Sequence, residues 1–164
     1  MFLLFEKMEK IILDYCGQIQ EIVGLYQREH VYRDLLLQRL RTTYSDALPE
    51  VVVPFRSDAG NGHCLRIDID VPSQKAMLEL KSTNAMTKEE VFWQVRSYLE
   101  NMDRTTGYIV NFMSKQRVVE LFVIRKTEKH TASGMRKYTR SVAQYTRELG
   151  KVFEDLEDSG ELEL

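Results

Sequence analysis

Four charged side chains on two consecutive predicted strands could act together in catalysis. Asp68 and Asp70 lie two residues apart on the first strand, and Glu79 and Lys81 lie two residues apart on the second. Because side chains alternate across a strand, each pair lies on one face of its strand. A hairpin of the two strands would therefore bring an acid from the first next to an acid and a lysine from the second.

Carboxylates gathered in this way repel one another unless a cation lies among them. Hard oxygen ligands suit Mg²⁺, with Mn²⁺ as a substitute, and a neighbouring lysine can hold an attacking water in line. The simpler interpretation is a solvated sheet face with an acid–lysine pair across strands. The spacing alone favours that simpler interpretation.

Two further polar residues fall on or beside apolar helix stripes. Glu29 lies within the arc of the stripe formed by Tyr32, Leu36 and Leu40, where a carboxylate is costly without a partner. It would either pair with an arginine, such as Arg33 or Arg66, or face the predicted acidic pocket. Gln94 flanks the inward stripe of a later helix, where its amide needs hydrogen-bond partners, and the backbone could supply them.

The hydrophobic pattern predicts the elements that position these side chains. Apolar residues at steps of three and four indicate two helices in about the first forty residues, divided at Gly24. A third helix starts near Thr87 and ends before Gly107. Runs of alternating or β-branched residues indicate strands. The predicted strands cover residues 50–56, 65–71, 75–81, 108–112 and 118–124.

The last part of the chain has a different composition. Tyr138, Val142, Tyr145 and Leu149 follow a helical spacing, so we expect a basic amphipathic helix over residues 129–153, packed on the main domain or forming an interface. Residues 1–128 would form that main domain. Residues 154–164 carry six acids and no base and would be a disordered tail.

Surface residues indicate two kinds of partner. Arg136, Lys137 and Arg140 could contact DNA phosphates, although a charge run is more often only a solvated helix face. Trp93 lies on the helix side opposite the predicted core, where it packs against a terminal helix or forms an interface. A homodimer, or a larger assembly, could use Trp93 or the C-terminal helix.

Six short motifs in the right order make the chain resemble the PD-(D/E)XK nuclease superfamily, and more narrowly the small GxxExxY proteins within it. The matching positions are Gly24, Glu29 with Tyr32, Arg66 with Asp68, Glu79-Leu80-Lys81, Gln94 with Tyr98 and Leu99, and Gly107 with Asn111 and Phe112. The resemblance covers about residues 16 to 124. Two positions depart from the pattern: Tyr26 stands where the family has a glycine, and Leu25 where it has a proline.

The resemblance implies an α/β fold: a restriction-endonuclease-like αβββαβ core with a mixed sheet flanked by helices, extended by extra N-terminal and C-terminal helices. It also implies an endonuclease or exonuclease that hydrolyses DNA with Mg²⁺. Asp68 and Glu79 would bind the metal with the Leu80 carbonyl, and Asp70 could substitute for Asp68 because the interval to Glu79 is one residue longer than usual. Lys81 would position the attacking water.

The resemblance further implies that Gln94 orients the water or a phosphate and that Glu29 is an accessory acid. The alternative is a catalytically silent binding or structural subunit that keeps the nuclease fold. Retention of Asp68, Glu79 and Lys81 together favours the enzyme.

The composition fits this interpretation once the tail is considered. The chain has 164 residues and a net charge of −2, which alone disfavours a nucleic-acid partner. Without the acids of residues 154–164, 23 basic residues face 19 acidic ones, and the balance becomes +4. Cys16 and Cys64 are typical of reduced thiols, so we expect a soluble intracellular protein without a membrane segment.

Overall fold

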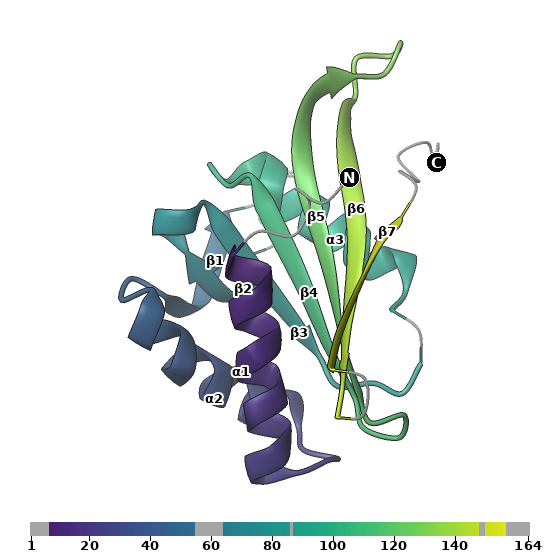
Figure 1. Cartoon of the computed structure of the whole chain (residues 1–164). Coiled ribbons are helices and arrows are strands. Elements are labelled where there is room, and N and C mark those ends of the chain that lie inside the picture. The colour runs from purple at the N-terminus through teal and green to yellow at the C-terminus, as the bar shows by residue number, and fades with distance from the viewer. Residues whose placement is uncertain (1–6, 55–63, 86, 148–149, 157–164) are drawn as a thin grey trace.

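The computed structural model describes residues 7–54, 64–85, 87–147 and 150–156. Three α-helices and a single sheet make up this part of the chain (Figure 1). The helices are α1 (Lys7–Val23), α2 (Glu29–Thr43) and α3 (Glu89–Asn101), and a short 3₁₀ turn spans Pro72–Gln74. The strands are β1 (Leu48–Pro54), β2 (Cys64–Val71), β3 (Ala76–Lys81), β4 (Thr106–Met113), β5 (Val118–His130), β6 (Arg136–Thr146) and β7 (Gly150–Leu156).

The seven strands lie in the sheet in the order in which they occur in the chain. All neighbours are antiparallel except β3 and β4, which are parallel. A parallel pair needs a crossover connection, and α3 supplies it. The predicted mixed sheet and the order helix, three strands, helix, strand are therefore confirmed, and α1 is the predicted extra N-terminal helix.

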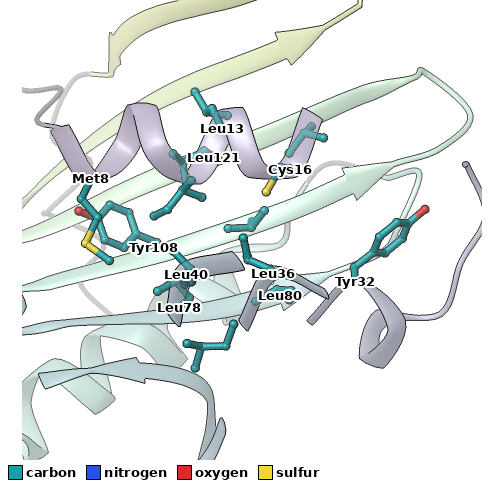
Figure 2. Packing of buried hydrophobic residues seen from close by; sticks show 14 of the residues in the cluster. Met8, Leu13, Cys16, Tyr32, Leu36, Leu40, Leu78, Leu80, Tyr108 and Leu121 are labelled. Carbon is teal, nitrogen blue, oxygen red and sulfur yellow. The ribbon is translucent and has the colours of Figure 1, made fainter. Parts of the chain in front are cut away.

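One face of the sheet is covered by α1 and α2, whose apolar stripes form the larger core (Figure 2). Leu13 and Cys16 of α1 and Leu36 of α2 are fully buried against apolar side chains of the central strands, including Leu78 and Leu80. The spacing of these helix residues at three and four positions explains why each helix turns one side to the sheet.

The opposite face is covered by α3, which forms a second core. Phe92, Val95 and Leu99 pack there against Met77 and Ile109 of the sheet. The two cores together bury β3 and β4 on both faces. This explains the nearly continuous apolar sequence of these strands.

Tyr32 fixes the connection between α1 and α2. Its ring stacks on Phe112 with the centroids 4.0 Å apart, and its hydroxyl donates to the Gly24 carbonyl at 3.1 Å. The same hydroxyl accepts a hydrogen bond from the Gln27 amide at 3.2 Å. The loop that precedes Glu29 is therefore held against the end of β4.

The predicted C-terminal helix over residues 129–153 is wrong. The end of β5, all of β6 and the start of β7 occupy this range, and a helix interface there is excluded with it. Side chains on both faces of β6 are buried, since Tyr138 belongs to the core beneath α3 and Ala143 belongs to the core beneath α1. Because apolar side chains occur on both faces of β6, its sequence lacks the apolar–polar alternation that would indicate a strand. The helical spacing of its apolar residues is accidental.

The predicted acidic tail is only partly visible. Residues 154–156 belong to β7, the edge strand beside β6, whereas residues 157–164 lie outside the described residues. None of the helices in the described part of the chain is both long enough and apolar enough to cross a membrane.

Gly107 of β4 marks the closest approach of α3 to the sheet. A Cβ atom on this residue would lie 2.3 Å from Cγ1 of Val95. The backbone preference of a strand favours alanine over glycine by roughly 0.5–1 kcal/mol, but overpacking a core costs about 1–3 kcal/mol. We therefore expect Gly107→Ala to lower the free energy of unfolding in urea.

The double variant Gly107→Ala/Val95→Ala is the control, because truncating Val95 makes room for the new methyl group. We expect the double variant to be more stable than the sum of the two single changes predicts. Strict additivity of the two changes would show that α3 does not press on β4 at Gly107.

Candidate active site

Asp68 and Glu79 lie beside each other where β2 and β3 separate. The register pairs Ile69 with Leu78, so Asp68 and Glu79 occupy the next positions on the two strands. The Asp68 carboxylate accepts a hydrogen bond from the Leu80 amide at 2.7 Å. The Asp68 side chain thus takes the place that a backbone carbonyl of β2 would have as the acceptor for the Leu80 amide. Beyond the Ile69–Leu78 pair, β3 has no further backbone pairing with β2 in the described part of the chain.

Lys81 is the cation next to this pair. Its Nζ lies 3.4 Å from Oε1 of Glu79. The Glu79 carboxylate is buried, and its other oxygen, Oε2, has no hydrogen-bond partner among the described residues. A buried acceptor without a partner is costly, so Glu79 is incompletely satisfied by the protein alone.

Burial raises the pKa of Glu79 to about 8, and the negative charge of Asp68 adds to this effect, whereas Lys81 opposes it. Burial also raises the pKa of Asp68, although the Leu80 amide and the charges of Lys81 and Arg33 act against it. The two carboxyl groups are therefore protonated more readily than ordinary acids. A bound cation would remove that tendency.

Glu29 faces the same site from the first turn of α2. Partial burial raises the pKa of its carboxyl group; Lys81 lowers it, and Asp68 raises it. Arg33 pairs with Asp34 and Glu50 instead of Glu29, at 3.0 Å in each case. Of the two alternatives, Glu29 does not pair with Arg33. It lies at the start of α2, where the helix end faces the acidic pair.

A groove of about 300 Å³ leads to Asp68. Its lining residues are Arg28, Glu29, His30, Arg33, Asp68 and Leu80. Two of these side chains, Arg28 and Arg33, are arginines, and neither was singled out as a site residue from the sequence. A polyanion would thus meet positive charge before it reaches the acidic pair.

Gln94 reaches the site through Tyr98, a residue whose role the sequence did not indicate. The Gln94 amide donates to the Tyr98 hydroxyl at 2.7 Å, and this hydroxyl donates to the Arg66 carbonyl of β2 at 3.0 Å. Burial raises the pKa of Tyr98 to about 12, and Glu79 adds to the effect. Tyr98 therefore stays neutral and holds α3 to the strand that carries Asp68.

Asp70 is in a different environment from Asp68. Both of its oxygens accept hydrogen bonds from Arg104, each at 2.7 Å, and the side chain is buried. A bidentate arginine pair satisfies a carboxylate geometrically and electrostatically. This arrangement disfavours Asp70 as a substitute ligand.

Asn111 is buried beside the site and holds the loop that follows Lys81. Its side-chain oxygen accepts a hydrogen bond from the Thr83 amide at 3.1 Å, and its side-chain nitrogen lies 3.5 Å from the Ala85 carbonyl. A single asparagine inside the apolar run of β4 is the sequence signal that points to such a role.

The three candidate DNA contacts on β6 do not form one surface. Arg140 is bound to Glu89 at 3.0 Å and covers the ring of Phe92. Arg136 pairs with Glu100 at 3.8 Å on the same face of the strand, and alternation turns Lys137 to the other face. Trp93 lies in a separate hollow lined in part by Arg96 and Tyr138, so it faces the β5–β6 hairpin.

The donor set fits a hard divalent cation such as Mg²⁺. It consists of the Asp68 and Glu79 carboxylates, both with raised pKa values, and Oε2 of Glu79 is buried without a hydrogen-bond partner among the described residues. Among the described residues, no three His, Cys, Asp or Glu side chains gather as a metal cage. Mg²⁺ is commonly held by only one or two carboxylates, and water and substrate complete its shell.

This fold and this arrangement of acids and lysine define the class of the protein. A model of the PD-(D/E)XK nuclease superfamily matches residues 6–126, which is most of the chain. The chain therefore belongs to the PD-(D/E)XK nuclease superfamily. No curated protein matches the chain significantly, and no solved structure does so either.

The raised pKa of Glu79 predicts how the metal-free protein responds to pH. Native Glu79 keeps its proton up to about pH 8, whereas an unfolded glutamate loses it near pH 4.5. The native state binds more protons in this interval, so this residue lowers the free energy of unfolding as the pH rises. In EDTA, we expect Glu79→Gln to be more stable than the wild type at pH 8, on the order of a few kcal/mol.

Urea unfolding at pH 4 and pH 8 tests this expectation, and the gain should largely vanish at pH 4. Glu21→Gln, which changes an exposed glutamate of α1, is the control and should show no such gain. An equal effect of Glu79→Gln at both pH values would contradict the burial of an ionisable Glu79.

Proposed function

We propose that this protein is a metal-dependent nuclease that hydrolyses phosphodiester bonds of DNA. The observation that carries the proposal is the buried Oε2 of Glu79, which has no hydrogen-bond partner in the described part of the chain although Asp68 and Lys81 are adjacent. A buried glutamate beside a half-buried aspartate, with one lysine for the two, is costly for a fold on its own. A cation and a phosphate would complete the site.

Asp68 and Glu79 would hold Mg²⁺, or Mn²⁺ in its place, together with the Leu80 carbonyl. When bound, the ion supplies Lewis-acid polarisation of a phosphoryl oxygen and neutralises charge. The hydrogen bond from the Leu80 amide keeps the Asp68 carboxylate fixed at the edge of β3. Glu79 contributes a carboxylate that stays near Lys81.

Lys81 would hold the attacking water in line and stabilise the charge that develops on the phosphate. Its side chain is 27% exposed, so the ammonium group lies close to Glu79 and is still partly accessible to solvent. Gln94 would orient the water or a phosphate oxygen. Glu29 would be an accessory acid at the groove wall.

DNA cleavage tests the proposal directly. We expect supercoiled or single-stranded DNA to be cut with Mg²⁺ or Mn²⁺. Lys81→Ala and Glu79→Gln should each lower the rate at least about a hundredfold, as expected for loss of a preorganised electrostatic group. Asp70→Asn is the matched control, because it removes a carboxylate of the same strand that is bound to Arg104 and should lower stability more than cleavage.

Wild-type protein that is inert on all DNA forms and with both metals would overturn the proposal. That result would favour the alternative of a silent nuclease-fold subunit. Calorimetric titration with Mg²⁺ separates the two cases further, since binding that depends on Asp68 and Glu79 identifies a metal site independently of turnover.

Tyr98 provides a subtler test, because we expect it to affect the chemical step by orienting Gln94. Tyr98→Phe removes the hydroxyl that accepts from Gln94 and donates to the Arg66 carbonyl. We expect cleavage to fall about tenfold, with a lower kcat and an unchanged KM, because the Gln94 amide loses its orientation. In a Gln94→Ala background the same change should have little further effect on kcat.

Stability should fall by about 1 kcal/mol in Tyr98→Phe, whether or not Gln94 is present, because the Arg66 carbonyl also loses its donor. Full additivity of the two kcat effects would contradict the positioning role of Tyr98.

A further inference from the structure

Tyr26, in the loop between α1 and α2, combines an unfavourable backbone with an exposed ring. Its φ is 63°, and 69% of the residue is exposed. Four non-glycine residues in the described part of the chain have positive φ, and Tyr26 is the aromatic one among them.

Folding alone does not explain this residue. The left-handed region is disfavoured for a bulky side chain, and glycine adopts it without strain. An exposed ring gains little from burial in return. Strain that persists without a packing benefit is typical of functional positions.

The backbone of Tyr26 is fixed at the entrance of the candidate active site. Its amide donates to Oγ of Ser114 at 2.8 Å, on the turn between β4 and β5. The next residue, Gln27, accepts a hydrogen bond from Ser82 at 3.0 Å, and Ser82 directly follows Lys81. Two residues after Tyr26, Arg28 lines the groove that contains Asp68, so the Cα atoms of Tyr26 and Arg28 are at most about 8 Å apart.

The charges around the ring suit a polyanion. Arg28 and Lys115 lie close to Tyr26 in the folded chain, and no carboxylate of the described residues forms an ion pair with either. Both side chains are exposed. An exposed aromatic ring with exposed cations nearby is typical of sites that bind single-stranded nucleic acid, in which the bases stack on rings and the phosphates meet the cations.

We propose that Tyr26 stacks on an unpaired nucleobase of DNA next to the phosphodiester that enters the groove. The inference rests on the proposed nuclease function and defines its substrate class. The preferred substrate would contain unpaired nucleotides at the cleavage position, because a base inside a duplex presents no free face to a side chain. Tyr26 would determine specificity and would take no part in the chemical step.

Anisotropy of labelled oligonucleotides tests the stacking. A single strand and a blunt duplex of the same sequence are titrated with full-length protein in Mg²⁺. All proteins carry Lys81→Ala to limit cleavage, and a gel checks that the probes stay intact. Tyr26→Phe keeps the ring, whereas Tyr26→Gly removes it and tolerates the left-handed backbone.

We expect Tyr26→Phe to bind the single strand within about twofold of Tyr26, and Tyr26→Gly to bind it about tenfold more weakly or worse. The duplex should bind equally to all three. A fluorescent adenine analogue in the single strand should be quenched with Tyr26 and Tyr26→Phe but not with Tyr26→Gly. The thermal midpoint of Tyr26→Gly should not fall, since the change relieves backbone strain.

Other outcomes overturn the inference in distinguishable ways. If Tyr26→Gly binds the single strand normally while DNA cleavage still depends on Lys81, the stacking role is wrong and the nuclease function stands. If both probes lose affinity equally, Tyr26 is a general contact and the unpaired-base specificity is wrong. If Tyr26 protein binds neither probe and cleaves no DNA, both the inference and the proposed function fail.

Discussion

The burial of Glu79 beside Asp68 is the constraint on which the rest of the site depends. Two adjacent carboxylates with one lysine destabilise a fold unless they are protonated or accompanied by a cation, and the raised pKa values of both groups express that cost. The protein tolerates it because the strands that carry the acids lie between two well-packed cores. The packing of helices on both faces thus supplies the stability, while the Glu79 carboxylate keeps an oxygen without a hydrogen-bond partner among the described residues.

The parallel step between β3 and β4 determines which groups surround the acids. The crossover through α3 brings Gln94 and Tyr98 over the strands, and the Tyr98 hydroxyl ties the helix to β2. Asn111 then holds the crossover loop through the Thr83 amide. If β3 and β4 were joined by an antiparallel hairpin, there would be no helix and no crossover loop between them. The parallel topology therefore supplies the uncharged side chains of the site.

Much of this arrangement could be predicted from the sequence, because the relevant patterns are local. Alternation in β2 and β3 was sufficient to place an acid of β2, either Asp68 or Asp70, beside Glu79, and helical spacing was sufficient for α1 and α3. The distinction between Asp68 and Asp70 could not be predicted, because it depends on Arg104, which lies 34 residues from Asp70 in the chain. The strand β6 was missed for a similar reason: its register with β5 buries Ser141, Val142 and Ala143 in succession, and no periodicity of a single segment encodes that.

The electrostatics of the groove couple the two ligands that the site would take. The acidic pair repels a phosphate, whereas Arg28 and Arg33 at the groove wall attract one. A metal ion at Asp68 and Glu79 would offset the negative charge of the acidic pair. Binding of a phosphate along the whole groove is therefore favourable only when the ion is present. A bound phosphate in turn supplies oxygen ligands that two carboxylates cannot provide alone. Each ligand therefore raises the affinity for the other by the same factor. This coupling is strong because the protein itself supplies only two carboxylates to the ion and leaves the other coordination positions to the phosphate and water.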